Sequence, residues 1–456
     1  MVSDRYFPSW ETVHHAASFG DVPVLAEVDV CVVGGGAAGV AAASTAAEAG
    51  HSVMLIERYG FCGGAAVAGM SGTICGMYLA SDKVRTPEQV VFGFTERFRQ
   101  RLSQRGGLTA PQIYGKTWTV THDPLVWRES ADQFLNEAGV RVLYHTVVTG
   151  VLIDQGTYRG LLLESSAGRS QIHAKVVVDA SGDASVVARA AGSYTFGDNG
   201  KIQNPTMFFR LGNVDTQRFA EAWGADTICS PEISELIHDG NAQGRYALPR
   251  EKIWVFPTPR QNELLVNATR LQAKDGRMLN VIDPEDFTQA EVLGRQQVRE
   301  YAKFFAENVI GCEDSYVIDT GVEAGIRQTR SIVGVETLRN ADVLDCRKRP
   351  DGICRVPWPI ELHVGERPKL HWLLDDYYEV PFQALIPAVG ENILVAGRCL
   401  SAEHEALASA RVTAQCFEYG QAAGLAATYA IENRVKVRDI SGETVRNLMR
   451  SHGSAL

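Results

Sequence analysis

The chain has 456 residues, of which 45% are hydrophobic and 21% are charged, so it can bury a large core and is not a disordered polymer. Its 44 Lys and Arg residues against 54 Asp and Glu residues give a formal net charge of −10. Nucleic acids and anionic membranes attract basic surfaces, so we expect neither as a partner.

Cysteine spacing and hydropathy exclude several further classes. Nine cysteines without a CxxC pair argue against a zinc ribbon, a redox pair or a secreted disulfide framework, and we expect no metal site. The N-terminal segment lacks a signal-peptide pattern, and the chain has no apolar run long enough to cross a membrane. The sequence therefore predicts a cytoplasmic enzyme without a membrane span, and it leaves a homo-oligomer open.

The first strong elements form a βαβ pattern. Residues 28–33 are an almost continuous β-branched run, which is typical of a central parallel strand. A glycine-rich turn at 34–39 follows, then an alanine-rich helix to about Ala49 and a second buried run at 52–56. Strand, turn, helix and strand in direct succession make a βαβ unit.

The later elements change character twice. Helices are predicted at 87–105 and 124–138, and strands at 140–143, 147–153 and 175–179. Between about 200 and 380 the pattern becomes one of antiparallel strands, at 207–211, 254–257 and 263–271, with a polar helix at 283–308. A buried strand at 392–396 and a helix at 409–431 close the chain.

These elements predict an α/β fold in two domains. A Rossmann-like nucleotide-binding domain with a parallel sheet is expected in two parts, over residues 25–200 and 380–440. A β-rich α+β substrate domain over residues 201–379 interrupts it.

The turn at 34–39 carries a dinucleotide fingerprint in its expected context. Gly34 allows the tight turn, Gly36 lets the backbone approach a pyrophosphate, and Gly39 lets the helix pack closely on the sheet. The helix N-terminus offers N–H groups and partial positive charge to the phosphates. Glu57, which closes the second buried run, can accept hydrogen bonds from ribose hydroxyls and repels a 2′-phosphate.

Three further segments favour FAD over NAD. No second GxGxxG occurs, so this motif binds one dinucleotide. A small-residue loop containing Gly63 and Gly64 follows Glu57 and Arg58, and could line the rest of a long cofactor. The tetrad 180–183 follows a buried strand and would bring Asp183 near the ribityl–pyrophosphate stretch, and the late strand 392–398 returns the chain to the cofactor.

With these motifs the sequence resembles the FAD-dependent oxidoreductases of the glutathione-reductase-like superfamily, in the group that includes p-hydroxybenzoate hydroxylase and fumarate reductase. The resemblance implies FAD, two domains and redox chemistry, without a substrate. Redox cysteines of the disulfide reductases would stand at Ala66 and Ser71, so that activity is not expected. The motifs that carry the resemblance are VVGGGAAGVAAA (32–43), VVVDASGDASVVARAAG (176–192), GIRQTRSIVG (325–334), YEVPFQALIP (378–387), ENILVAGRCLSAEHEALASARV (391–412) and GQAAG (420–424).

In related flavoproteins a helix N-terminus points at the N1/C2=O edge of the flavin and stabilises its reduced anion. The resemblance implies this role for the helix start near Ser409, whereas Gly420 and Gly424 are expected to permit close helix packing. The expected cofactor-binding residues are Gly34, Gly36, Ala37, Ala38, Gly39, Glu57, Arg58, Gly63, Gly64, Val147, Ser181, Gly182, Asp183, Gly397, Arg398, Ser409, Ala410 and Arg411.

Two histidines are candidates for a catalytic base. The resemblance implies that the loop bearing His404 lies near the isoalloxazine ring, where an imidazole could take a proton as hydride leaves the substrate. A histidine that only fixes the loop is the structural alternative. His363, in the β-rich segment, is the second candidate base.

Arg327 and Arg330 match the arginine-bearing segment of the family, and Arg327 is the leading candidate to grip a substrate carboxylate. An interdomain salt bridge is the alternative. Asn267 and Arg270 lie on a strand that could face the flavin. Cys62 could attach a flavin covalently, and a buried small residue is the other interpretation.

The sequence predicts an FAD-dependent dehydrogenase or oxidase. We expect it to oxidise a CH–OH or CH–NH group of a small polar substrate by hydride transfer to flavin N5. A flavin monooxygenase that uses NAD(P)H and O2 is one alternative, and a non-catalytic flavin-binding subunit is another.

Overall fold

The computed structural model describes residues 22–363 and 369–456. Its largest sheet contains the βαβ unit: β1 (Val24–Val33), α1 (Ala37–Glu48) and β2 (Val53–Ile56). β6 (Arg141–Leu143) pairs with β2 in parallel, and β9 (Gly168–Asp179) pairs with β1 in parallel. The predicted parallel strands and the α/β class are thus confirmed.

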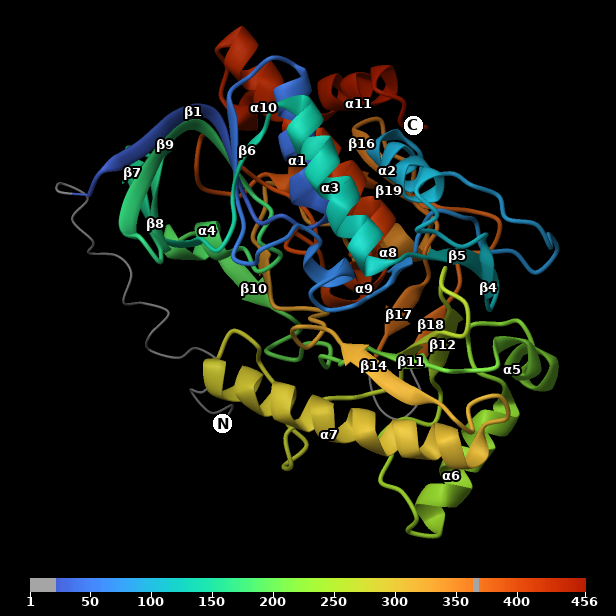
Figure 1. The fold of residues 1–456 in the computed structure, drawn as a ribbon. Helices are drawn as coiled ribbons and strands as arrows, with labels where there is room; N and C mark the ends of the chain where they lie inside the picture. The colour runs from blue at the N-terminus through green and yellow to red at the C-terminus, as the bar shows by residue number, and fades with distance from the viewer. Residues whose placement is uncertain (1–21, 364–368) are drawn as a thin grey trace.

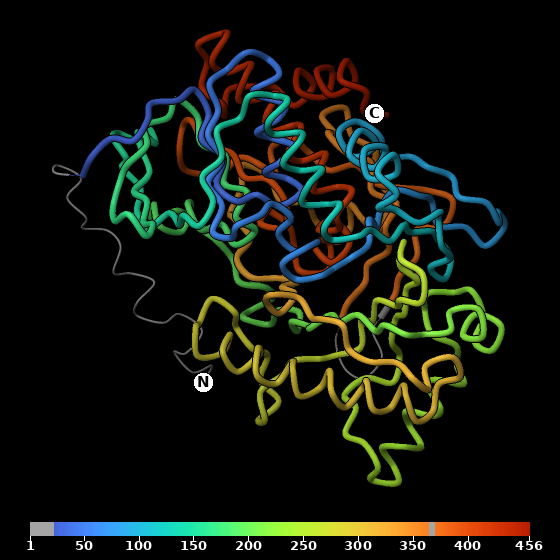
Figure 2. Tube along the Cα trace, viewed as in Figure 1, coloured from blue at the N-terminus to red at the C-terminus, as the bar shows by residue number. Residues whose placement is uncertain are grey.

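The long strand β9 joins two parts of the sheet. Its last residues pair in parallel with β20 (Ile393–Val395), which comes from the far end of the sequence. Its first half pairs antiparallel with β8 (Thr157–Ser165), and β8 pairs antiparallel with β7 (Val147–Asp154) at the edge of the sheet. Figure 2 shows the consequence, because the earliest and latest segments of the chain lie together above the middle segments.

Helices cover the main sheet on the side of α1 (Figure 1). α1 packs on α10 (Thr413–Asn433), with α3 (Pro124–Ala138) and α2 (Gly93–Gln104) beside them. A Cβ on Gly420 would lie 2.1 Å from the carbonyl oxygen of Ala38, so the two helices touch backbone to backbone. The expected packing role of Gly420 and Gly424 is confirmed.

A second sheet occupies the lower half of the molecule in Figure 1. Its order is β12 (Trp254–Pro257), β13 (Leu264–Asn267), β11 (Phe209–Gly212) and β14 (Tyr316–Thr320), all antiparallel. α7 (Pro284–Asn308) lies along it and shares a separate hydrophobic cluster with its strands. Two further helices, α5 (Thr216–Trp223) and α6 (Pro231–Ala242), flank this sheet.

The remaining elements are short strands, which form small separate sheets, and short helices. Residues from the 338–373 stretch pack into the same hydrophobic cluster as α1 and α10. The domain boundaries at 200 and 379 stay predictions. The remaining strands are β3 (Thr73–Ile74), β4 (Gln112–Tyr114), β5 (Thr117–Thr121), β10 (Tyr194–Phe196), β15 (Arg330–Ile332), β16 (Gly352–Val356), β17 (Ile360–Leu362), β18 (Lys369–His371) and β19 (Tyr378–Pro381), and the remaining helices are η3 (Gly64–Ala66), α4 (Ser185–Arg189), α8 (Asn340–Leu344), η4 (Phe382–Leu385), α9 (His404–Ala410), η5 (Val437–Asp439) and α11 (Gly442–Ser451).

Two predicted helices have the wrong bounds. The helix predicted at 409–431 is two helices, α9 and α10, because Val412 has an extended backbone with φ −76° and ψ 163°. The helix predicted at 87–105 begins only at Gly93, since Gln89 pairs with Tyr78 in a β-bridge. In both places a contact with a distant segment overrides the local helical pattern.

Candidate active site

A cavity of about 520 Å³ opens where four parallel strands end. Val33, Ile56, Ala180 and Ala396 line it, and they lie at or directly after the carboxyl ends of β1, β2, β9 and β20. Ligands of open α/β sheets bind at this edge. The lining includes most of the expected cofactor residues: Gly34, Gly36, Ala37, Ala38, Glu57, Arg58, Gly63, Gly64, Val147, Ser181, Gly182, Asp183, Gly397, Arg398 and Arg411.

The glycine turn has the shape that a diphosphate requires. Gly36 faces Gly64 so closely that a Cβ on Gly64 would come within 3.0 Å of the Gly36 Cα. Both residues line the cavity, and α1 begins directly after Gly36 with no acidic residue in its first turn. The positive end of the helix dipole therefore borders the cavity, with no carboxylate from the first turn of α1 beside it.

Gly39 does not line the cavity and serves packing instead. A Cβ at this position would lie 1.8 Å from the carbonyl oxygen of Gly34, so α1 could not start there with any larger residue. Its expected contact with the cofactor stays a prediction, whereas its expected role in close packing agrees with this geometry.

Glu57 lies at the end of β2 and is held by two backbone groups. Its Oε2 accepts from the N–H of Gly35 at 2.6 Å, and its Oε1 accepts from the N–H of Tyr59 at 2.9 Å. Burial raises the pKa of Glu57, and these hydrogen bonds act against that rise. Arg58 beside it pairs with Glu323, which also accepts from the Tyr59 hydroxyl.

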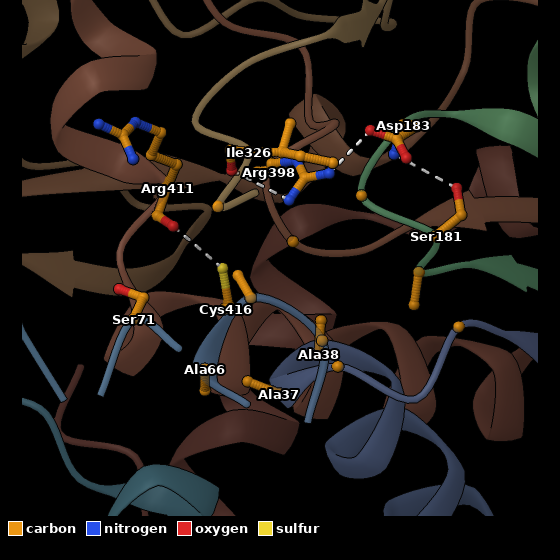
Figure 3. A pocket seen from close by; sticks show the side chains of 18 of the residues that line it. Ala37, Ala38, Ala66, Ser71, Ser181, Asp183, Ile326, Arg398, Arg411 and Cys416 are labelled. Atoms are coloured by element: carbon orange, nitrogen blue, oxygen red, sulfur yellow. Dashed lines mark hydrogen bonds and ion pairs between the residues drawn. The ribbon is translucent and has the colours of Figure 1, made fainter. Parts of the chain in front are cut away.

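Asp183 connects the loop after β9 to the loop after β20. Its Oδ1 accepts from Nη2 of Arg398 at 2.7 Å and from the Thr329 hydroxyl at 2.7 Å. Burial alone would raise the pKa of Asp183, but the charge of Arg398 and these hydrogen bonds outweigh it, so the pKa lies below its ordinary value. Figure 3 shows Arg398, Asp183 and Ser181 in one chain of contacts along the cavity.

The helix whose N-terminus borders the cavity is α10, which begins at Thr413 and not near Ser409. Val412, Thr413 and Cys416 line the cavity there, at and after the break between α9 and α10. Ser409 lies instead near the end of α9, fully buried, where its hydroxyl donates to the Trp358 carbonyl oxygen at 2.5 Å. Ser409 and Ala410 are not among the lining residues, because the expected continuous helix is broken after them.

Beyond the glycine turn the same cavity is lined by a group of polar side chains. We call Arg327, Arg411, Glu361, His363 and Tyr114 the polar chamber. The Tyr114 hydroxyl donates to Glu361 at 2.8 Å, and Nε2 of His363 lies 3.5 Å from the same carboxylate. Arg327 donates to the Asn204 carbonyl oxygen at 2.8 Å and to Oδ1 of Asn267 at 3.2 Å.

The two candidate bases occupy different places. His363 lines the cavity, and burial, then Arg327, Arg250 and Arg411, lower its pKa well below the ordinary value. His404 is the first residue of α9 and is not among the lining residues, and burial lowers its pKa as well. Its predicted position beside the flavin ring thus lacks support from the cavity.

The other singled-out residues divide between cavity and core. Arg330 and Asn267 line the cavity, while Arg270 is not among its lining residues. Cys62 is fully buried and contacts the Tyr144 hydroxyl at 3.6 Å, outside the lining, which fits the interpretation as a buried small residue.

Sequence reasoning missed Glu361, Tyr114 and Arg250. Glu361 stands two residues before His363, a spacing that shares one face of a strand, so that pair was detectable. Tyr114 and Arg250 carry no such local signal, because they approach His363 only through Trp254, whose ring packs near all three side chains.

Two kinds of feature are absent from residues 22–363 and 369–456. No three His, Cys, Asp or Glu side chains of these residues gather as they would around a metal ion. Every helix in this part of the chain is too short or too polar to cross a bilayer.

Several known proteins are similar in sequence to this chain. The chain is 30% identical over 236 residues to a digeranylgeranylglycerophospholipid reductase of Methanoculleus marisnigri, a match that covers 50% of this chain and 52% of that one. It is 25% identical over 233 residues to a thiamine thiazole synthase of Aeropyrum pernix, covering 49% and 76%. The chain thus matches about half the length of the first relative.

Among solved structures, a geranylgeranyl bacteriochlorophyll reductase-like protein of Thermoplasma acidophilum aligns with a TM-score of 0.47 and 15% identity, over 93% of this chain and 91% of that one. The model of the family described as "FAD dependent oxidoreductase" matches residues 29–449. This span takes in the glycine turn, the Asp183–Arg398 contact and the polar chamber. The chain therefore belongs to the FAD-dependent oxidoreductase family, and its cofactor is FAD.

Proposed function

We propose that this enzyme oxidises a CH–OH or CH–NH group of a small substrate that bears a carboxylate. One observation carries the proposal: the cavity that begins at the glycine turn continues into a chamber lined by the His363 imidazole and the buried Arg327 guanidinium. A dinucleotide site and a substrate site in one cavity fit a redox enzyme.

The residues that line the cavity suit the successive parts of FAD, from the diphosphate and ribose to the flavin. Gly36, Ala37 and Ala38 would hold the diphosphate, Glu57 the adenosine ribose, and the start of α10 the flavin edge. When bound, FAD supplies the hydride acceptor at N5.

His363 is the proposed base. We assign the imidazole proton to Nε2, which lies 3.5 Å from Oε1 of Glu361, and the lone pair to Nδ1. Nδ1 is buried and has no hydrogen-bond partner among the described residues. When the substrate C–H bond breaks and its electron pair leaves as hydride, the O–H or N–H proton passes to Nδ1, and a carbonyl or imine remains.

Arg327 is the proposed anchor for the carboxylate. Its side chain is 6% exposed, and hydrogen bonds to Asn204 and Asn267 fix the orientation of the guanidinium. A carboxylate bound there would supply a counter-charge to the guanidinium, so the reacting carbon would be held in place.

Anaerobic mixing tests this function. The FAD-loaded enzyme is mixed with 2-hydroxy acids, amino acids, and the matching alcohols and amines without a carboxylate, and the loss of flavin absorbance is followed. We expect bleaching by members of the carboxylate series and little with their uncharged counterparts. Bleaching only by NAD(P)H, with substrate-stimulated oxygen uptake, would instead indicate the monooxygenase.

A further inference from the structure

The polar chamber holds more positive charge than its own carboxylate can balance. Arg250 is 3% exposed and donates to Asn267, as Arg327 does, while Arg327 and Arg411 line the cavity. Of the described carboxylates, Glu361 is the one whose charge acts on all three. Three guanidinium groups against one carboxylate leave an excess of two positive charges, and Arg270 adds to it at Arg250.

Two of these guanidinium groups meet at one atom. Oδ1 of Asn267 accepts from Nη2 of Arg327 at 3.2 Å and from Nη1 of Arg250 at 3.4 Å. Like charges held this close in a buried place repel each other, and an anion nearby is needed to offset the repulsion. The described residues offer only Glu361, and it already receives the Tyr114 hydroxyl.

Hydrogen-bond donors around the chamber are also left over. Nη2 of Arg250 and Nε of Arg411 are buried without a partner among the described residues. The side-chain amide nitrogens of Gln203 and Asn204 are also buried without a partner among the described residues. The side-chain oxygen of Gln203 accepts from Nη2 of Arg411 at 2.9 Å. Buried donors without partners are rare in native proteins, and a cluster of them indicates a ligand that accepts hydrogen bonds.

From this excess we infer that the chamber is built for a dianion: a small substrate with two carboxylates, or with one phosphate monoester, bound between the Arg250–Arg327 pair and Arg411. The inference rests on the proposed function for the identity of the chamber as the substrate site. It goes beyond the proposed function because a single substrate carboxylate, together with Glu361, would still leave one of the three guanidinium groups without a counter-charge.

Calorimetry on the FAD-loaded enzyme tests this in low-salt buffer without anionic components, since salt weakens charge selectivity. Dicarboxylates of two to six carbons are each compared with their monoamide, and methyl phosphate with dimethyl phosphate. The expected result is that at least one dianion binds 100-fold or more tightly than its matched monoanion. The dicarboxylate series and the methyl phosphate comparison together show which of the two kinds of dianion the chamber binds.

Variants give a second measurement. Arg250→Met reduces the excess to one charge, so the ratio of dianion to monoanion affinity should fall at least tenfold. Arg218→Met, at an exposed arginine that pairs with Glu313 far along the chain, should leave the ratio unchanged. FAD content and melting temperature show whether each variant is folded.

Equal affinity for dianions and monoanions, or no binding by any dianion of the series, overturns the inference. Bleaching by a monocarboxylate 2-hydroxy acid, without dianion preference, would keep the proposed function and remove only this inference. Tight dianion binding by an enzyme whose flavin is bleached by no donor of the panel would keep this inference and contradict the proposed function.

Discussion

Arg398 donates from Nη2 to Oδ1 of Asp183 at 2.7 Å, although 215 residues separate them. Asp183 follows β9 and Arg398 follows β20, and these two strands pair in register at Val177–Asp179 and Ile393–Val395. The hydroxyl of Thr329, from the segment between them, joins the same carboxylate. One contact therefore ties three distant parts of the chain together at the wall of the cofactor cavity.

Replacing Asp183 by Asn should destabilise the protein strongly. It leaves Arg398 partly buried without its counter-charge, and breaking such a pair typically costs about 3–5 kcal/mol. Urea unfolding measures the loss, and FAD content after gel filtration should fall with it. Glu164→Gln, which removes an exposed ion pair with Arg169, is the control and should have a small effect. Equal stability of the two variants would contradict the role of the contact.

Gly36→Ala should separate cofactor binding from folding. Gly36 has φ −70°, which alanine accepts, and the nearest atom to a new Cβ is 3.8 Å away. The FAD-free protein should therefore melt normally, while the methyl group keeps a diphosphate off the turn and weakens FAD binding by about tenfold or more. Gly39→Ala, whose Cβ would meet the Gly34 carbonyl, should instead fail to fold. Normal FAD affinity in Gly36→Ala would remove the turn from the cofactor site.

The assignment of the base predicts a difference between two histidine variants. His363→Gln should slow anaerobic flavin reduction by about 100-fold or more, because it removes the proton acceptor at the chamber wall. His404→Gln should leave the rate close to that of the natural enzyme, since His404 does not line the cavity. Stopped-flow absorbance measures both, and the reverse order of effects would restore His404 as the base.

The rate of flavin reduction should depend little on pH near neutrality. Burial, then Arg327, Arg250 and Arg411, lower the pKa of His363 well below 6.5, so Nδ1 stays unprotonated as the pH falls past that value. In Arg327→Met one of these positive charges is lost, and the inflection of the pH–rate profile should move upward. An inflection that stays in place would show that another group is titrated.

The free energy of unfolding should fall as the pH rises from 4.5 to about 7, because of Glu418. Burial raises the pKa of this carboxyl from 4.5 to about 7, despite hydrogen bonds from Ser454 and Thr95. Between these values the folded state holds a proton that the unfolded state releases, so a contribution of about 3 kcal/mol, present below pH 4.5, is lost by pH 7.

Glu418→Gln keeps the size of the side chain and removes the titration. Its melting temperature should vary less between pH 5 and pH 8 than that of the natural protein, and it should be higher at pH 8. Glu443→Gln, at an exposed position in the first turn of α11, serves as the matched control. Parallel pH profiles of the natural protein and Glu418→Gln would contradict the prediction.

Local sequence was enough to define the βαβ unit, the glycine turn and the acidic residue after β2. These features depend on near neighbours in the chain, where side-chain period and glycine backbone freedom decide the local conformation. The helix at Pro124–Ala138 was also predictable to the residue, because Asp123 caps it and Gly139 ends it in a left-handed conformation.

The way the chamber residues come together, in contrast, follows from long-range packing. Arg250, Glu361 and Arg411 come from segments far apart. Glu361 lies on β17 and Arg411 directly follows α9, and the packing of α9 against β17 sets their relative position. The break at Val412 has the same origin, since the local pattern there favours one helix. Periodicity reports which face of an element is buried, whereas the partner of a buried charge depends on contacts between distant segments, which no local pattern contains.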